Sequence, residues 1–250
     1  MSLSLRGFRK TAVTLAVGLA AAGCGSPDLK YVPHGAPSGE KVNIGPVPNL
    51  PQRPIKAGED YTIWGVSYSL RSRTHSTDVA GKKLNLTGYV VKTNLPDVPP
   101  CAVHKTGKAD PEGCKAPVPS FWIGDTKDAD IKDCIKVMGW ASNFAQVFDA
   151  IEKYKKEEKE TDKSKLEAQV DNFWGVKLPR PLPAKGGKLT VTGTYATTFT
   201  RATSSAEADP IMGLMTYDEV KWLEEPPEVA TLPGMDKDKP GAPEPKGKKK

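Results

Sequence analysis

Two segments of the chain repeat a pattern that is typical of strands in a small, strongly bent β-barrel. Residues 84–90 (Leu-Asn-Leu-Thr-Gly-Tyr-Val) and 189–195 (Leu-Thr-Val-Thr-Gly-Thr-Tyr) both alternate apolar and polar side chains, and both carry Thr-Gly at the same place. Strict alternation puts one side of a strand into a core. A glycine inside a strand relieves crowding where a sheet bends sharply. The chain is therefore predicted to be mainly β.

Further strands are expected on both sides of these two segments. Residues 121–125 and 135–140 are apolar runs of strand length, and residues 211–223 alternate more weakly. Residues 61–70 also alternate and are predicted to form an additional N-terminal strand. The side chains expected on one face of that strand are Trp64, Val66, Tyr68 and Leu70.

One helix is expected between the runs at 135–140 and 189–195. Ser142 or Asn143 can cap its start. The charged run at 155–165 predicts that the helix continues into solvent, with pairs such as Lys153 and Glu157. Apolar residues recur at helical spacing at Phe144, Val147, Phe148, Ile151 and Tyr154.

This order of elements resembles the OB-fold, a five-stranded Greek-key barrel with a helix between its third and fourth strands. The extra N-terminal strand and the long helical insertion depart from that family. An unrelated small β-barrel or a sandwich is the alternative. The resemblance assigns the barrel strands to residues 83–93, 118–125, 133–140, 187–200 and 211–223.

The OB-fold resemblance also implies a ligand-binding face. In that family, oligonucleotides or oligosaccharides bind on strands two and three, between the loops that here span residues 94–117 and 201–210. For the tryptophans, packing in the core is the stronger alternative. The candidate residues on or near this face are Trp122, Lys136, Met138, Trp140, His104, Lys105, Lys108 and Arg201.

Residues 1–23 have the composition of a signal peptide. Three basic residues, Arg6, Arg9 and Lys10, precede an apolar run at 11–22. This run is too short to cross a membrane, which takes roughly 20 residues. We therefore expect the segment to direct export and then to be removed.

The sequence Ala21-Ala22-Gly23-Cys24 resembles the lipobox of bacterial lipoproteins. The resemblance implies cleavage before Cys24 and acylation of its thiol, for example with palmitate. The family prefers leucine where this chain has Ala21, and Gly25 favours the outer membrane over the inner membrane. The alternative is ordinary signal cleavage that leaves Cys24 as an unmodified thiol.

The chain is predicted to have four parts. Little periodicity and many prolines and glycines after Cys24 predict a tether, and a similar composition predicts a disordered tail. The expected parts are a signal peptide at 1–23, a lipidated N-terminus and tether at 24–58, an OB-like domain at 59–224 and a Pro/Lys-rich tail at 225–250.

The formal net charge of +6 comes from the two ends of the chain. Residues 1–23 and residues 236–250 contribute +3 each, so residues 24–235 are formally neutral. A protein that follows a phosphate backbone usually carries excess positive charge on its folded surface. Nucleic acid is therefore disfavoured as a partner, while the tail lysines should attract anionic lipid headgroups or wall polymers.

The cysteines allow two interpretations. In an exported protein, Cys101 and Cys114 are expected to form a disulfide, which for a loop of this length stabilises the fold by about 3 kcal/mol. Alternatively, these cysteines could bind a metal together with His104 and with Cys134 or His75. Cys134 is expected to be a buried, inert thiol. Interchain pairing, or a second bridge if Cys24 is unmodified, stays open.

The sequence contains no nucleophile motif and no glycine-rich phosphate loop. The chain is therefore predicted to be a non-enzymatic binding or assembly module, without cofactor or metal. It would be held by Cys24 at the bacterial envelope, with a protein or glycan partner. The alternatives are an oligosaccharide or single-stranded nucleic-acid binder on the OB face, and a metal-dependent enzyme at Cys101, His104 and Cys114.

Overall fold

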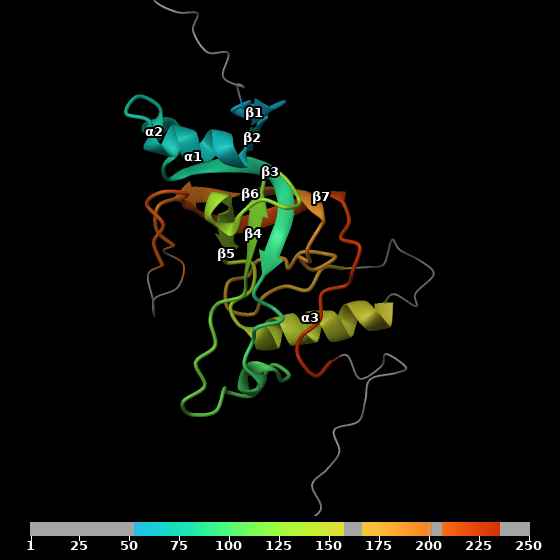
Figure 1. Ribbon diagram of the computed structural model, residues 1–250. Coiled ribbons are helices and arrows are strands. Elements are labelled where there is room, and N and C mark those ends of the chain that lie inside the picture. The colour runs from blue at the N-terminus through green and yellow to red at the C-terminus, as the bar shows by residue number, and fades with distance from the viewer. Residues whose placement is uncertain (1–52, 158–166, 200, 202–206, 236–250) are drawn as a thin grey trace, which may run out of the picture. The chain divides into compact units, whose positions relative to one another are not determined.

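A computed structural model describes residues 53–157, 167–199, 201 and 207–235. Five strands close into a barrel in the order β3-β4-β5-β7-β6, with β6 pairing back to β3 (Figure 1). β5 and β7 run parallel, and the other barrel neighbours are antiparallel. This closed order is that of an OB-like barrel, so the predicted fold is confirmed. The strands are β3 (Lys82–Thr93), β4 (Ser120–Gly124), β5 (Ile135–Met138), β6 (Lys188–Ala196) and β7 (Leu214–Glu224).

The repeated Thr-Gly pattern lies where β3 and β6 bend and approach other backbone closely. A Cβ on Gly193 would lie 2.0 Å from the carbonyl oxygen of Thr216 on β7, at a register shift between the two strands. A Cβ on Gly88 would lie 2.9 Å from the carbonyl oxygen of Gly124 on β4. Both distances are too short for any side chain, so glycine is required at both positions.

The predicted strand over residues 61–70 is wrong for most of its length. The chain forms β1 (Lys56–Ala57) and β2 (Asp60–Thr62), and β2 runs parallel to β3. Helix α1 (Ile63–Arg71) follows at once, because the Thr62 side chain accepts a hydrogen bond from the backbone N–H of Gly65 and caps the helix. The extra N-terminal strand is therefore short.

The apolar residues of α1 fit a helical period as well as an alternating one. Ile63, Val66 and Leu70 are buried on one side. Trp64 and Tyr68, four residues apart, stack with their ring centroids 4.9 Å apart on the other side. The same side chains therefore fit both a strand and a helix, and the cap provided by Thr62 favours the helix.

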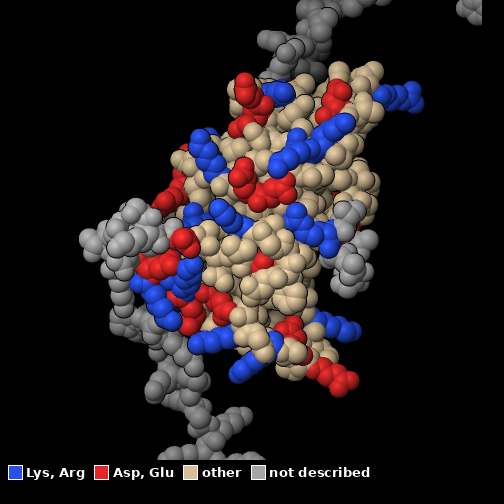
Figure 2. All heavy atoms as spheres, turned by 180° about the vertical axis from the view of Figure 1, so that it is seen from behind, with Lys and Arg blue, Asp and Glu red and all other residues tan. Residues whose placement is uncertain are grey.

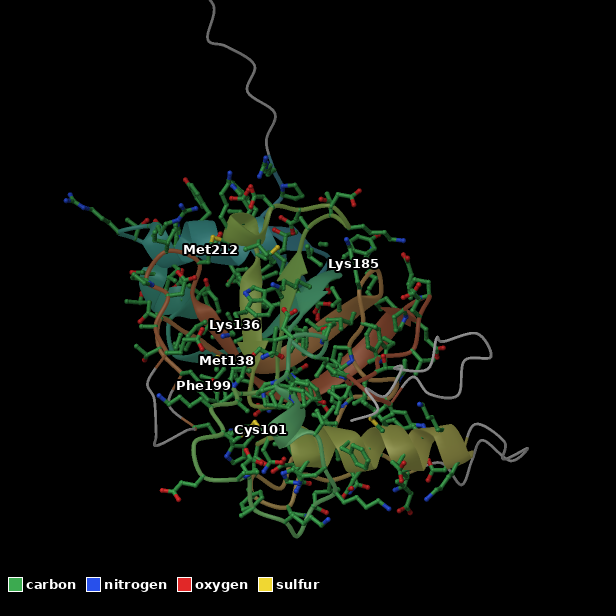
Figure 3. The ribbon with its side chains drawn as sticks, turned by 60° about the horizontal axis from the view of Figure 1, so that its bottom comes forward. Cys101, Lys136, Met138, Lys185, Phe199 and Met212 are labelled. Carbon is green, nitrogen blue, oxygen red and sulfur yellow. A yellow bond between two sulfur atoms is a disulfide. The ribbon has the colours of Figure 1, made fainter. Side chains whose placement is uncertain are left out.

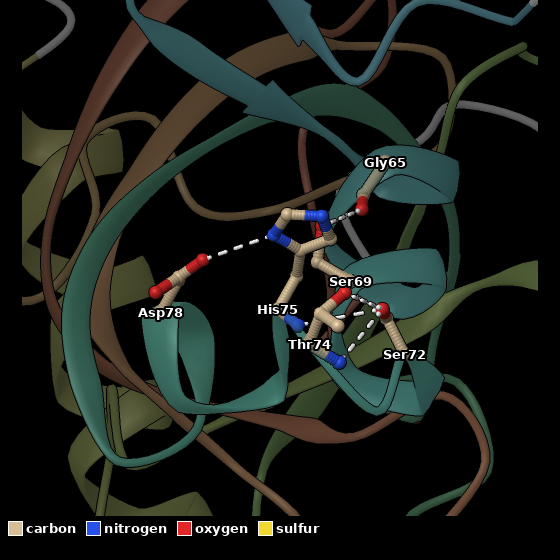
Figure 4. A network of polar contacts seen from close by, with 6 residues as sticks. All are labelled: Gly65, Ser69, Ser72, Thr74, His75 and Asp78. Carbon is tan, nitrogen blue, oxygen red and sulfur yellow. Dashed lines mark hydrogen bonds and ion pairs between the residues drawn. The ribbon is translucent and has the colours of Figure 1, made fainter.

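A polar network closes the turn between α1 and α2 (Ser76–Val79), as Figure 4 shows. The Ser69 hydroxyl donates to the carbonyl of Gly65 at 2.9 Å. The Ser72 hydroxyl accepts the backbone N–H of His75 at 3.3 Å, and the His75 ring lies 3.3 Å from the Asp78 carboxylate. These bonds tie α2 to α1 at one end of the barrel, while α3 lies at the other end (Figure 1).

Helix α3 (Phe144–Glu157) confirms the predicted helix. The Asn143 side chain accepts the backbone N–H of Gln146 at 3.1 Å and caps its start. The predicted continuation towards residue 165 lies outside the described residues. Two short 3₁₀ helices complete the elements, η1 (Pro100–Ala102) and η2 (Ile131–Asp133).

The folded body continues past residue 224, where the tail was predicted to begin. Ala230 and Leu232 are buried in the core, and the Lys155 ammonium donates to the carbonyl of Met235 at 3.4 Å. Residues 53–58, predicted as tether, include β1. Residues 1–52 and 236–250, with Cys24 and the basic tail, lie outside the described residues. Within the described ranges, no helix is long and apolar enough to cross a membrane.

Candidate ligand-binding face

Trp122 points outward from the middle of β4. Its neighbours Phe121 and Ile123 are fully buried in the barrel core, so strand alternation turns the indole between them to the outside. Trp122 pairs with Lys92 on β3 and with Lys136 on β5. The lysine ammonium groups lie 5.9 Å and 5.1 Å from the indole centroid, respectively, within the range of cation–π attraction.

Each of these lysines also has a carboxylate partner. The Lys136 ammonium donates to Glu207 at 2.5 Å, and the Lys92 ammonium lies 3.6 Å from Asp97. The half-buried indole of Trp122 is therefore surrounded by hydrogen-bond donors and acceptors of both charges. We call Trp122, Lys92, Lys136, Asp97 and Glu207 the Trp122 site.

Figure 3 shows Lys136 and Met138 next to each other along β5, with Phe199 beyond Met138. Met138 was a candidate ligand-facing residue, but it is buried. It forms a small apolar cluster with Phe199 and Leu214, against which the partly buried side chains of Val118 and Trp174 pack. The chain itself thus covers this part of the OB face and leaves the Trp122 site beside it.

A buried carboxylate holds the turn that carries Trp174. Asp171 accepts hydrogen bonds from the backbone N–H groups of Phe173 and Trp174, at 2.9 Å and 2.7 Å. It also accepts the backbone N–H and the hydroxyl of Ser142, just before α3. These charge-assisted bonds fix the turn against the start of the helix.

Arg201 lies next to the residues that cover Met138. Its guanidinium donates to the backbone carbonyls of Gly139 and Tyr217, at 2.9 Å and 3.0 Å, and to Asp218 at 3.3 Å. It lies 6.0 Å from the Trp174 ring centroid. Three hydrogen bonds to the protein thus anchor Arg201 between the end of β5 and β7.

Trp140 does not belong to the ligand face. It is fully buried in the core, with its ring 6.3 Å from that of Phe121. Strict strand alternation would place Trp140 on the same outward face as Lys136 and Met138. The strand ends at Met138, however, and Gly139 adopts a φ of 86°, in the left-handed region that breaks the alternation and turns Trp140 inward.

His104 and Lys105 are bound to their own loop and to α3. The His104 ring contacts the Lys105 carbonyl at 2.9 Å and the Asp110 carboxylate at 2.8 Å, and these two bonds raise the pKa of His104 in that order of importance. The Lys105 ammonium lies 3.7 Å from Glu152 on α3. Among the described residues, neither His104 nor Lys105 forms a hydrogen bond or ion pair with Trp122 or Lys136. Lys108, a further candidate, is an exposed residue of the same loop.

The predicted disulfide between Cys101 and Cys114 is present, with its Cα atoms 6.0 Å apart. A bridged pair has no thiolates to offer, so the alternative metal site at Cys101, His104 and Cys114 is wrong. Cys134 is buried, and burial, followed by the nearby carboxylate of Asp133, raises its pKa to about 11. Within the described ranges, no group of three or more acidic, histidine or cysteine side chains could hold a metal ion.

The sequence alone did not reveal three members of the Trp122 site. Lys92 is brought to the indole by the strand register, whereas Asp97 and Glu207 lie in loops and join the site through their ion pairs with Lys92 and Lys136. A β-bulge between Val90 and Lys92 sets that register. Strand alternation could have placed a β3 lysine opposite Trp122. The bulge that selects Lys92 could not have been predicted from the sequence.

No protein-family model matches the chain, and no curated protein matches it significantly. Among solved structures, it resembles a protein described as an aspartyl-tRNA synthetase from Leishmania major Friedlin, with 14% identity and a TM-score of 0.29 over 67% of this chain and 21% of that chain. It also resembles two OBodies bound to hen egg-white lysozyme. The first is 11% identical, with a TM-score of 0.25 over 60% of this chain and 88% of that chain. The second is 9% identical, with a TM-score of 0.24 over 59% and 85%. The OB-like assignment therefore rests on the strand order of the closed barrel.

Proposed function

We propose that this chain is a lipid-anchored protein of the bacterial envelope whose OB-like barrel binds a glycan, without catalysis, at the Trp122 site. The observation that supports the binding role is the indole of Trp122 between the ammonium groups of Lys92 and Lys136, at 5.9 Å and 5.1 Å from the ring centroid. An aromatic ring offers an apolar platform for the C–H face of a sugar.

The mixed charge around Trp122 favours a glycan over a nucleic acid. Sugar hydroxyls both donate and accept hydrogen bonds, and the site supplies ammonium donors next to the carboxylate acceptors Asp97 and Glu207. A phosphate backbone needs cations that are not already neutralised. Figure 2 shows basic and acidic side chains interspersed over the back of the body, which also suits a glycan of modest charge.

The membrane anchor in this proposal is acylated Cys24. A tether rich in proline and glycine after it would let the barrel reach ligands away from the lipid surface. Intact mass of membrane-extracted protein tests this part. A mass increment of fatty-acyl chains on a chain that begins at Cys24 supports it, and release of the protein from membranes by Cys24→Ser is expected. An unmodified N-terminal segment would overturn it.

Tryptophan fluorescence of the full chain tests the binding role. We expect acidic and neutral envelope oligosaccharides to change the emission of the wild type, and Trp122→Leu to abolish the change. Phe173→Leu is the matched control, because Phe173 is a 72% exposed aromatic residue outside the site. Equal responses of Trp122→Leu and the wild type would contradict the proposal.

A single-stranded nucleic acid is the second candidate, because bases stack on aromatic rings and lysines contact phosphates. Salt dependence separates the two candidates. Nucleic-acid binding should weaken steeply between low and moderate salt, whereas glycan binding through hydrogen bonds and stacking should change little.

A further inference from the structure

A second aromatic residue lies beside the Trp122 site on the outer surface of the barrel. Tyr89 on β3 pairs with Gly124 on β4, and Trp122 pairs with Lys92. Gly124 follows Trp122 by two residues, so both positions belong to the same outward face of β4. Diagonal neighbours on one face of a strand pair are about 7–8 Å apart. Tyr89 and Trp122 therefore occupy adjacent places on one surface.

The surroundings of Tyr89 repeat those of Trp122. The ammonium groups of Lys127 and Lys188 lie 5.2 Å and 5.0 Å from the Tyr89 ring centroid. Lys188 comes from β6, where it pairs with Tyr89, and Lys127 comes from the turn after β4. Lys127 also has a carboxylate partner, Glu224, at 3.4 Å. A half-buried ring again lies between two lysines and next to an acidic group.

The surface beside Tyr89 is hollowed. A cavity of about 780 Å³ is bordered by Tyr89 and Lys188, and its wall also includes Thr87, Lys132 and Asp133. The cavity is also lined by Asp125, whose two carboxylate oxygens accept backbone N–H groups of α1. The hollow thus offers further donors and acceptors for hydroxyl groups next to an aromatic wall.

The surface between the two rings carries small side chains. Gly124 has none, and the Ala129 methyl group lies over it, 2.6 Å from where a Cβ of Gly124 would be. Gly124 is therefore required for the turn to lie this close to β4. On β3, Val90 and Val91 lie between Tyr89 and Lys92; Val90 is buried in the core, and the half-buried Val91 lies at the bulge.

From this repetition we infer that Tyr89, Lys127 and Lys188 form a second subsite, and that the ligand is a linear polysaccharide of modest charge that spans both aromatic sites. The inference rests on the proposed function and specifies its ligand. Two linked subsites make the second contact intramolecular, so the affinity for a long chain exceeds that for a short one without any new type of contact.

Titration of the full-length protein with uncharged β-1,4-linked N-acetylglucosamine oligomers of graded length tests the inference. For the wild type, affinity should rise steeply from the disaccharide to the octasaccharide. Tyr89→Leu should weaken octasaccharide binding at least tenfold and leave the disaccharide unchanged, because the disaccharide needs only the Trp122 site. Tyr89→Phe should bind like the wild type, since it keeps the ring. Lys188→Gln should weaken the octasaccharide, whereas Lys83→Gln, an exposed β3 lysine paired with Asp218, should not.

The other outcomes are equally informative. If Tyr89→Leu binds every length like the wild type while Trp122→Leu binds none, the second subsite is overturned and the Trp122 site stands. If Trp122→Leu also binds like the wild type, or no oligomer binds, the proposed function fails as well. If single-stranded poly(dT) binds more tightly than the octasaccharide and depends on Tyr89, the ligand is a nucleic acid and the glycan class is overturned.

Discussion

The carboxylate of Asp125, at the end of β4, accepts the backbone N–H of Ile63, the first residue of α1, at 2.8 Å. Its second oxygen accepts the backbone N–H of Trp64 at 2.9 Å. Two orphan donors at the start of a helix are thereby satisfied by a residue 62 positions away in the sequence. This contact docks α1 onto the barrel and orders the wall beside Tyr89.

Replacing Asp125 should therefore loosen α1. Asp125→Ala removes a charged acceptor from the helix start, so we expect a loss of about 1–2 kcal/mol in the free energy of unfolding. Hydrogen exchange at residues 63–71 should accelerate more than exchange in β6. Asp128→Ala, an exposed acidic residue of the same turn, is the control and should leave both quantities unchanged. Equal protection of α1 in the two variants would contradict this role.

The disulfide between Cys101 and Cys114 should contribute strongly to stability. It closes a loop with a sequence separation of 13, and reduction should lower the free energy of unfolding by about 3 kcal/mol. Thr106, inside this loop, donates its backbone N–H and its hydroxyl to Asp149 on α3, so reduction should also loosen the loop from the helix. Denaturant titration with and without reductant measures the change.

The double variant Cys101→Ser/Cys114→Ser is the control for reductant effects elsewhere. It should unfold at the same denaturant concentration with and without reductant, close to that of the reduced wild type. A wild type whose midpoint does not move on reduction would contradict the prediction.

Cys134 should be unreactive in the folded protein. Its thiol is buried, donates to the carbonyl of Asp130 at 3.3 Å, and has a pKa of about 11, so almost none is thiolate at neutral pH. Maleimide should label it only after denaturation, as mass spectrometry of non-reduced protein would show. Rapid labelling under native conditions would mean that the turn after β4 opens readily.

His104 should make stability depend on pH. When protonated, it donates to both the Lys105 carbonyl and the Asp110 carboxylate, which raises its folded pKa. The stabilisation is thus fully present below the unfolded pKa of about 6.5 and is lost as pH rises through the folded pKa. The difference in Tm between the wild type and His104→Gln should therefore be largest near pH 5 and shrink by pH 8.5.

Asp110→Asn tests the partner in this pair. The Tm of Asp110→Asn should depend on pH less than that of the wild type and more like that of His104→Gln. The reason is that a neutral amide favours the imidazolium less than a carboxylate does. A difference in Tm that grows with pH would show that the assigned sign is wrong.

The barrel could be predicted from the sequence because its strands bury one face and expose the other. The glycines in residues 84–90 and 189–195 marked the sharp bends, since neither Gly88 nor Gly193 has room for a side chain. Residues 61–70 could not be assigned this way. Their apolar side chains fit both periods, and the helix depends on the Thr62 cap and on the distant Asp125.

The candidate site could be predicted only in part. Trp122 and Lys136 follow from the alternation of neighbouring strands. Lys92 reaches the indole because of a bulge, and Trp140 leaves the face because of the backbone conformation of Gly139. Both are local breaks in strand geometry, which a period of two cannot reveal.

The most direct test of glycan binding at the Trp122 site is a nuclear magnetic resonance titration of the full chain, which carries five tryptophans. Each indole N–H gives one resonance, and Trp122→Phe identifies the signal of Trp122. On addition of the octasaccharide, we predict that the Trp122 resonance shifts while that of the fully buried Trp140 stays in place. A Trp122 resonance that does not move at saturating octasaccharide would contradict the account.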